Sequence, residues 1–120
     1  MRRVHFLLSC KGSLPCSLTL DTACSSAMYA LHMAVLGIRN GDCDGAIVAG
    51  SNLISDPGPQ MFITKLGALS PSSMSQTFDA AADGYARAEG VGALYIMPLS
   101  RALEGSYPIR AVIRGTAVNA

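Results

Sequence analysis

The chain has 120 residues, of which 50% are hydrophobic and 14% charged, and its formal net charge is +1. This length accommodates one small domain and is too short for two ordinary ones. Nine Lys and Arg against eight Asp and Glu, without a basic run, argue against an electrostatic nucleic-acid binder. Small domains normally carry more polar residues than this. The composition therefore fits either a fragment whose apolar surface is covered by further chain or a partner, or a complete apolar domain.

The first residues are weakly similar to a targeting signal. Met1-Arg-Arg3 precedes the apolar run Val4 to Leu8. His5 lies inside this run and Lys11 follows it, so we expect no signal peptide. Elsewhere no stretch approaches the ~18 consecutive apolar residues that a membrane-spanning helix requires.

The four cysteines are too sparse for a disulfide scaffold and form no C-x-x-C pair. Neither His5 nor His32 stands at a zinc-like spacing from them. We therefore expect no metal site and a reducing compartment, the cytoplasm. The cysteines are Cys10, Cys16, Cys24 and Cys43.

The first half of the chain has the pattern of a strand, a helix and a strand. Leu18 to Leu20 is a short β-favouring stretch that runs into Asp21-Thr-Ala-Cys24. A helix is predicted from Ser25 to Arg39, and Asn40-Gly41 ends it, since both residues tolerate the left-handed backbone of a helix terminus. Ala46 to Ala49 is predicted to be a strand buried on both faces. This order predicts a right-handed parallel βαβ unit.

Apolar residues at helical spacing define one face of the predicted helix. We expect this face to be its buried side. The residues are Met28, Leu31, Ala34, Val35 and Ile38.

The second half of the chain alternates loops with shorter predicted elements, which makes the whole an α/β protein. Loops are expected at 55–60 and 70–75, and most of 79–90 is small or charged. The predicted elements are a short helix at 61–66, a strand at 91–99, a helical turn at 100–104 and a last strand at 109–118.

Cys24 is the strongest candidate for chemistry, because it lies where the predicted strand turns into the predicted helix. The first amides of a helix are unpaired and its dipole is positive there, which favours a thiolate. The same amides can stabilise an oxyanion on a thioester carbonyl. We expect Cys24 to end the strand and open a buried helix. From the pattern alone, a structural cysteine in a turn of small residues is the alternative.

The string Asp21-Thr-Ala-Cys-Ser-Ser26 resembles the active-site motif of β-ketoacyl synthases in modular and iterative polyketide synthases. The resemblance continues in family order over nearly the whole chain and is greatest to iterative type I synthases of the fungal kind. The further blocks are Gly41 to Asn52, Lys65 to Pro71, Phe78 to Gly90 and Pro108 to Asn119.

The resemblance implies a thiolase-like α/β fold built from two related halves. Residues 1–106 would be part of the N-terminal half and 107–120 the start of the C-terminal half. It implies that Cys24 accepts an acyl group from an acyl carrier protein, followed by decarboxylative Claisen condensation with a malonyl thioester. Its substrates would be carried on phosphopantetheine, with no cofactor bound directly. The full domain would be a homodimer that binds neither nucleic acid nor membrane.

Members of this family also use two histidines and a lysine that lie further toward the C-terminus. His5 and His32 do not stand in those histidine motifs, and His32 is expected to be a helix-face residue that contacts the next element. We therefore expect a fragment that does not condense acyl units by itself. Two departures from the family are a longer segment at 11–20 and Ala88, where many members carry glycine.

The remaining candidates are weaker. Cys43 is expected to be structural, and Cys10 and Cys16 have no evident activating partner. The glycines at 84, 90 and 92 match neither dinucleotide nor nucleotide-triphosphate spacing. The charged residues of the 79–90 block are expected to support the structure through turns and ion pairs rather than to act as acids and bases. They are Asp79, Asp83, Arg87 and Glu89.

Three functions stay open on the sequence alone. The first is a ketosynthase segment with Cys24 as nucleophile. The second is a remnant or partner-binding paralogue without catalysis, although such paralogues typically lack the cysteine. The third is a thiolase-type enzyme that acts on coenzyme A esters, which the Asp21 to Ser26 string disfavours.

Overall fold

The computed structural model describes the backbone of residues 4–10 and 16–119 and the side chains of residues 17–119. The chain divides into two compact units. Residues 1–51 and 91–120 form the first, and residues 52–90 form the second. Each unit is described by itself below.

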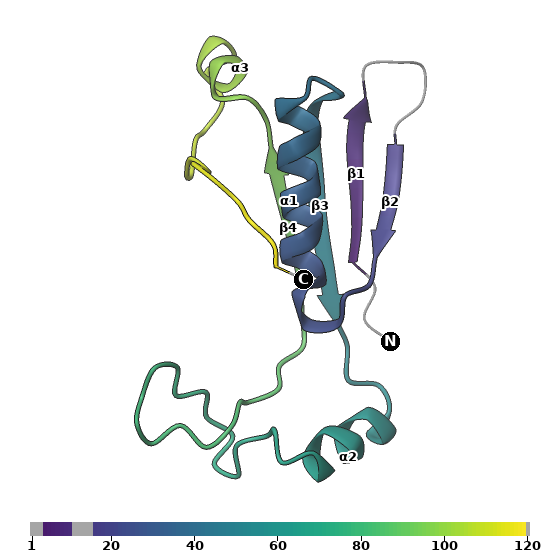
Figure 1. Cartoon of the computed structure of the whole chain (residues 1–120), viewed down its shortest axis with the longest axis vertical. Coiled ribbons are helices and arrows are strands. Elements are labelled where there is room, and N and C mark those ends of the chain that lie inside the picture. The colour runs from purple at the N-terminus through teal and green to yellow at the C-terminus, as the bar shows by residue number, and fades with distance from the viewer. Residues whose placement is uncertain (1–3, 11–15, 120) are drawn as a thin grey trace. The chain divides into compact units, whose positions relative to one another are not determined.

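The first unit is built on a four-stranded sheet in the order β2-β1-β3-β4. Its strands are β1 (Val4–Cys10), β2 (Cys16–Leu20), β3 (Cys43–Asn52) and β4 (Gly90–Ile96). β1 is antiparallel to both β2 and β3, and β4 runs opposite to β3 in Figure 1. Every pair of neighbouring strands is thus antiparallel.

The predicted strand, helix and strand correspond to β2, α1 (Ser26–Arg39) and β3. β2 and β3 run in the same direction, as predicted, because each is antiparallel to β1. They are not neighbours, however, because β1 lies between them. The run from Val4 to Leu8, weakly similar to a targeting signal in sequence, has the backbone of a strand that pairs on both sides.

The end of α1 follows the predicted stop signal. Asn40 is its C-cap, and Gly41 has a φ of 79°, in the left-handed region. The amides of Gly41 and Asp42 donate to the carbonyl oxygens of Ile38 and Gly37, at 3.1 and 2.9 Å. These bonds satisfy carbonyl groups that the end of a helix leaves open.

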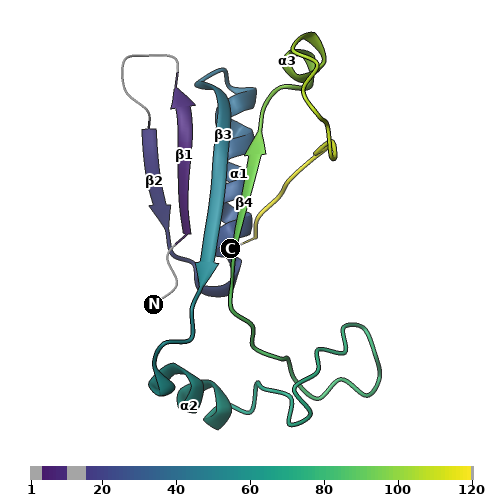
Figure 2. The same ribbon diagram turned by 180° about the vertical axis from the view of Figure 1, so that it is seen from behind.

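α1 covers one face of the sheet, as Figures 1 and 2 show from opposite sides. Its small residues Ala30 and Ala34 pack against Ala46 and Val48 of β3 in the buried core. Part of the predicted apolar face is confirmed, since Ala34 and Val35 are buried. The residues packed around this core are Leu20, Leu31, Ile38 and Ile96.

Met28 was predicted to be part of the buried face of α1, and this is wrong. Its side chain is 63% exposed. The buried side is instead the row Ser26, Ala30 and Ala34, whose members are four residues apart. Small side chains in this row let the helix lie close to the sheet. The helix therefore fills its contact with the sheet without the side chain of Met28.

β3 is buried on one face only, whereas burial on both was predicted. Ala46 and Val48 lie under α1, but Ile47 between them is 43% exposed. Alternate residues of a strand point to opposite faces. In Figure 2 no helix of the first unit covers the face that carries Ile47, within the residues that the structure describes.

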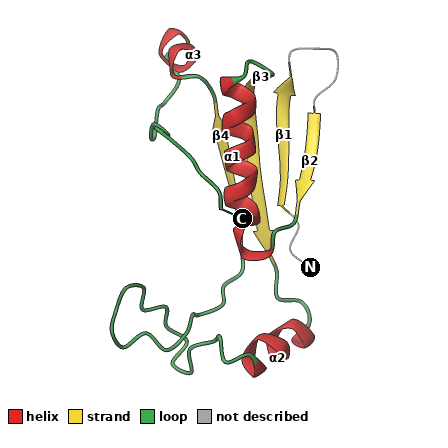
Figure 3. Ribbon diagram, in the orientation of Figure 1, coloured by secondary structure: helices red, strands yellow, loops and turns green. Residues whose placement is uncertain are grey.

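The last part of the chain only partly follows the prediction. β4 and the short helix α3 (Leu99–Glu104) are present where they were expected. Residues 109–118, predicted to be a strand, have no regular secondary structure. Figure 3 shows them as a loop beside α1. Within the described residues this segment pairs with no strand, and side chains of α1 bind its backbone instead.

Three side chains of α1 bind residues 114–119, two through backbone carbonyl groups and one through a side-chain hydroxyl. Arg39 Nη2 donates to the carbonyl oxygen of Arg114 at 3.0 Å, and His32 Nδ1 lies 2.8 Å from Thr116 Oγ1. The Tyr29 hydroxyl donates to the carbonyl oxygen of residue 119. His32 therefore contacts another element of the chain, as expected.

The second unit begins with α2 (Pro57–Lys65). This helix starts four residues before the predicted one, within the expected loop. The Asp56 carboxylate accepts a hydrogen bond from the Gly58 amide at 2.9 Å and caps the helix. Pro57 stands at the first helical position, where a missing N–H costs nothing. The prediction took Asp-Pro for a loop signal, although the same pair is a helix start.

Two loop segments of the second unit are joined by backbone hydrogen bonds. The Ser70 amide donates to the Tyr85 carbonyl, and the Tyr85 amide donates to the Ala68 carbonyl, both at 3.1 Å. Gly84, beside this bridge, has a φ of 139°. A Cβ at Gly84 would lie 2.5 Å from the Ser70 nitrogen, so only glycine allows the two segments to approach.

Many large apolar side chains are exposed in both units. Val91 and Leu103 are examples in the first, and Phe62 and Phe78 in the second. We expect the isolated 120-residue chain to self-associate, because exposed apolar surface of this extent is a site of protein contact. Light scattering after gel filtration should give a mass above the monomer, and a hydrophobic dye should bind. A monodisperse monomer that melts cooperatively would contradict this.

Gly84→Ala should destabilise the second unit far more than Gly67→Ala. Gly67 also has a positive φ of 66°, but a Cβ added there would meet nothing within 4 Å, so its variant should cost only about 1 kcal/mol. Gly84→Ala adds a clash with backbone and should cost about 3 kcal/mol. Hydrogen exchange of the Ser70 and Tyr85 amides in the two variants measures the difference. Equal protection in both would refute the close approach at Gly84.

Candidate active site

Cys24 lies in a short turn between β2 and α1. β2 ends at Leu20, a 3-10 turn (η1) spans Ala23–Ser25, and α1 begins at Ser26. The predicted order of strand, turn and helix is therefore confirmed. The prediction that Cys24 itself ends the strand and opens the helix is wrong, because β2 ends four residues before it and α1 begins two residues after it. Cys24 is also exposed. The reason is that Ser26, two residues later, takes the buried position at the start of α1.

Ala23, just before the cysteine, has a left-handed backbone. Its φ is 57°, where a Cβ comes too close to the following carbonyl oxygen. This conformation costs about 1–2 kcal/mol for a residue other than glycine. It persists only where the surroundings fix it. The left-handed backbone at Ala23 redirects the chain from the strand into the helix and so places Cys24 at the start of α1.

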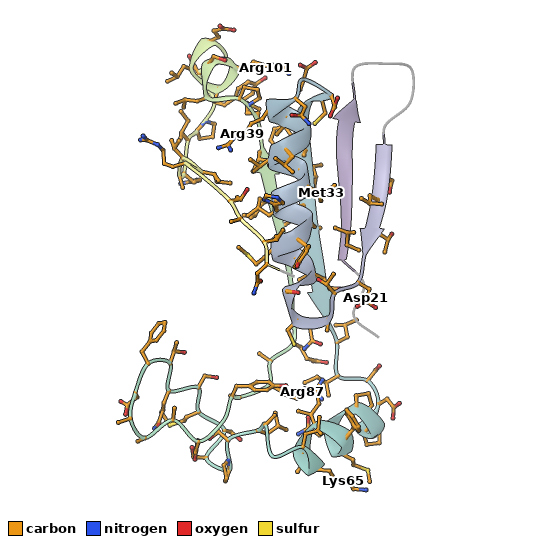
Figure 4. All side chains as sticks on the ribbon, in the orientation of Figure 1. Asp21, Met33, Arg39, Lys65, Arg87 and Arg101 are labelled. Atoms are coloured by element: carbon orange, nitrogen blue, oxygen red, sulfur yellow. The ribbon has the colours of Figure 1, made fainter. Side chains whose placement is uncertain are left out.

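Polar side chains fix the outer side of this turn. The Asp21 carboxylate accepts from the Ala23 amide at 3.1 Å. Ser25 Oγ donates to the Thr22 carbonyl at 2.8 Å and lies 2.9 Å from Thr22 Oγ1. Figure 4 shows Asp21 where the chain enters α1. These groups are exposed, so each bond competes with water.

Ser26 fixes the inner side of the turn. Its hydroxyl accepts from the Thr22 amide at 2.8 Å and donates to the Ala23 carbonyl at 2.7 Å. Ser26 is only 1% exposed. One buried hydroxyl thus satisfies two backbone groups, one before and one at the left-handed residue.

The electrostatic setting of Cys24 is that of a helix N-terminus. The positive end of the α1 dipole lies beside the turn, and the first turn of α1 contains no acidic side chain. Such a place favours a negative charge on a thiol or on an oxygen bound there. The turn can therefore hold an exposed nucleophile next to groups that stabilise an anion.

Residues 3–102 match the family described as "Beta-ketoacyl synthase, N-terminal domain". The chain belongs to the β-ketoacyl synthase family. It is 58% identical over 118 residues to prosolanapyrone synthase of Alternaria solani, covering 98% of this chain and 4% of that protein. It is 57% identical over 118 residues to a highly reducing polyketide synthase of Penicillium crustosum, covering 98% and 5%. The predicted similarity to ketosynthases of fungal polyketide synthases is confirmed, and the chain spans about one twentieth of these relatives.

Solved ketosynthases have the same fold. A ketosynthase from module 6 of the bacillaene synthase of Bacillus subtilis 168 matches with a TM-score of 0.68 and 36% identity, over 72% of this chain and 16% of its own. An oxazolomycin ketosynthase domain of Streptomyces albus JA3453 matches with a TM-score of 0.65 and 41% identity, over 71% and 15%. The fold is therefore thiolase-like α/β, as predicted.

Cys43 of this ketosynthase chain is less suited to chemistry than Cys24. Cys43, at the start of β3, is 2% exposed, which fits the structural role expected of it. Nothing is described of the side chains of Cys10, Cys16 and His5, so the expectations for them lie outside the described residues.

The charged residues of the 79–90 block act within the second unit. The Asp79 carboxylate accepts from the Ala81 amide at 2.8 Å, and the Glu89 carboxylate accepts from the Ile54 amide. Arg87, labelled in Figure 4, donates to the side-chain oxygen of Gln60 in α2 at 2.8 Å. These bonds agree with the structural role expected for three of the four residues. For Asp83 that role stays a prediction.

Two kinds of feature are absent from the part of the chain that the structure describes. No three His, Cys, Asp or Glu side chains there gather into a set that could hold a metal ion. None of its helices has the length and apolarity needed to cross a membrane.

Sequence reasoning found Cys24 but missed Ala23 and Ser26 as structural determinants. Alanine gives no signal for a left-handed backbone, which sequence patterns assign to Gly or Asn. For Ser26 a signal was present, since a serine at the start of an apolar helix face is a polar residue in a core position. Its burial requires hydrogen-bond partners.

Ala23→Val should destabilise the turn, because a β-branched residue is rarely accommodated at positive φ. We expect a loss of about 2 kcal/mol in the free energy of unfolding. Ala27→Val, on the exposed side of the first turn of α1, should cost only the helix propensity difference of about 0.6 kcal/mol. Urea unfolding followed by circular dichroism compares the two. Equal losses would mean that the left-handed backbone of Ala23 imposes no special constraint on its side chain.

Proposed function

We propose that Cys24 is the acyl-accepting nucleophile of a β-ketoacyl synthase of polyketide or fatty-acid biosynthesis. The observation that carries this proposal is an exposed cysteine at the N-terminal turn of α1, within the Asp21 to Ser26 string, in a chain of the ketosynthase family. The match to a ketosynthase family supports this function over a thiolase-type enzyme acting on coenzyme A esters.

In the first step, the Cys24 thiolate attacks the carbonyl carbon of an acyl thioester. The carbonyl electrons move to the oxygen, which amides at the start of α1 are oriented to stabilise. When the carbonyl re-forms, the carrier thiolate leaves and takes up a proton, and the acyl group stays on Cys24. Covalent catalysis of this kind divides one difficult transfer into two easier ones.

In the second step, a malonyl thioester loses CO₂, and the electron pair of the broken bond gives a carbanion equivalent. This carbon attacks the carbonyl of acyl-Cys24, a carbon–carbon bond forms, and the cysteine thiolate leaves. The acid–base groups for decarboxylation would be the two histidines and the lysine of the whole domain, which His5 and His32 do not supply.

The substrates of this reaction would be malonyl and acyl groups carried on the phosphopantetheine of an acyl carrier protein. In support of this carrier, relatives of the chain are named as polyketide synthases. The full-length domain would be a homodimer that works in the cytoplasm. A reducing compartment suits an exposed thiol such as that of Cys24, because it keeps the thiol from forming disulfides.

Residues 1–106 would be part of the N-terminal half of the ketosynthase, and 107–120 the start of the C-terminal half. In support, residues 109–118 combine a strand-like sequence with an extended course along α1 without a strand partner in the described residues. In the complete domain this segment would pair with a strand of the further chain.

Acylation of the purified chain tests the function. We expect mass spectrometry of peptides to find the acyl group of an added acyl thioester on Cys24 and to find none in Cys24→Ala. Cys43→Ala is the matched control, because Cys43 is buried, and it should keep the label. With malonyl carrier protein added, the 120-residue chain should give no ketoacyl product.

Other outcomes would contradict the proposal in different ways. Equal labelling of wild type and Cys24→Ala would overturn the nucleophile and favour a remnant without catalysis. Measurable ketoacyl product would show that these 120 residues suffice for condensation.

A further inference from the structure

We propose that Ser26 is a positioning residue for Cys24: its buried hydroxyl holds Ala23 in the left-handed conformation that presents the thiol at the start of α1. This inference rests on the proposed function, since it concerns how the proposed nucleophile is held. The role of Ser26 requires no contact with the thiol or a substrate, because it acts through the backbone of the turn.

The first support is the pattern of its hydrogen bonds. The hydroxyl accepts from the amide of Thr22 and donates to the carbonyl of Ala23, at 2.8 and 2.7 Å. These two groups belong to the peptide units before the Thr22 Cα and after the Ala23 Cα. Fixing both restricts the rotation that would return Ala23 from its φ of 57° to an ordinary value.

The second support is the burial of Ser26. It is 1% exposed and opens the row of small residues by which α1 packs on the sheet. The packing of the core therefore fixes the position of Ser26, and the hydroxyl of Ser26 in turn fixes the backbone of the turn. The hydroxyls of Thr22 and Ser25 bond the same turn from the exposed side, where water replaces such bonds at little cost.

Removal of this hydroxyl has a definite structural consequence. In Ser26→Ala, the Thr22 amide and the Ala23 carbonyl lose the partner that the buried side chain gives them. The Ala23 carbonyl keeps the bond from the Ser26 backbone amide, but the Thr22 amide is no longer tied to it through the hydroxyl. Ala23 then leaves the left-handed region more readily, and Cys24 moves away from the N-terminal amides of α1. The thiol should remain present and exposed but react more slowly, because it no longer lies at the positive end of the α1 dipole.

Four variants of the full chain test the inference: Ser26→Ala, Ala23→Gly, the double variant and Ser25→Ala. The rate of Cys24 acylation by an acetyl thioester of N-acetylcysteamine, a mimic of phosphopantetheine, is measured per folded molecule. Ser26→Ala should be slower by about tenfold, or about 1.4 kcal/mol in activation free energy. Ala23→Gly should stay within about threefold of wild type, since glycine accepts the left-handed backbone.

The double variant gives the decisive result. Glycine adopts a left-handed backbone without the Cβ penalty, so Ala23→Gly should restore most of the rate that Ser26→Ala loses. A role of Ser26 in core packing alone predicts no such rescue. Ser25→Ala, the same chemical change one residue earlier, should lose less than about threefold because the buried bridge remains.

Alkylation of Cys24 by iodoacetamide serves as a second readout that needs no enzymatic function. If wild type is not acylated but the slow rate and its rescue are seen in alkylation, the proposed function fails and the positioning role stands. Wild-type rates in Ser26→Ala, or a double variant as slow as Ser26→Ala, would overturn the positioning role. Should Ser26→Ala not fold, a folded double variant about tenfold slower than Ala23→Gly would overturn it as well.

Discussion

The close packing of α1 on β3 is the constraint on which the first unit depends. Ala30 and Ala34 present almost no side chain to Ala46 and Val48, so the helix lies close to the sheet. A larger residue in this row would push the helix outward, and overpacked cores typically lose about 1–3 kcal/mol. The same row begins with Ser26, so the distance between helix and sheet also determines where the turn that carries Cys24 lies.

The exposed face of α1 has a different role. Tyr29, His32 and Arg39 use polar atoms to hold the segment that follows α3, while the buried face uses contacts between small apolar groups. Figure 4 shows Arg39 at the C-terminal end of α1. One helix thereby connects the sheet, the cysteine turn and the last described residues. A ketosynthase nucleophile at such a junction would be held by more than its own loop.

What could be predicted from the sequence was whatever is decided by neighbours in the chain. The end of α1 at Asn40-Gly41 and the strand–turn–helix setting of Cys24 are local and were correct. β1 was not predicted, and residues 109–118 were wrongly predicted to be a strand, because strand formation depends on a distant partner. β1 has two such partners, and the later segment has none in the described chain.

The details of the site were less accessible to sequence reasoning. The family string identified Cys24, but the left-handed Ala23 follows from hydrogen bonds that no propensity encodes. Met28 was assigned to the core by its hydrophobicity. The helix residues that lie against the sheet are instead Ala30 and Ala34, because only small side chains fit where helix and sheet are close. Volume and hydrogen-bond geometry, rather than polarity, decided both points.

The insertion of the second unit between β3 and β4 bears on how the chain folds during synthesis. These strands are neighbours in the sheet, yet 37 residues (53–89) separate them. Closing such a loop costs about 2 kcal/mol more entropy than a four-residue hairpin. At about 5–20 residues per second, a ribosome needs about 2–8 s to supply the connection. During that interval the edge of β3 that will pair with β4 is exposed and can pair with a wrong strand. Only the synthesis of β4 covers this edge.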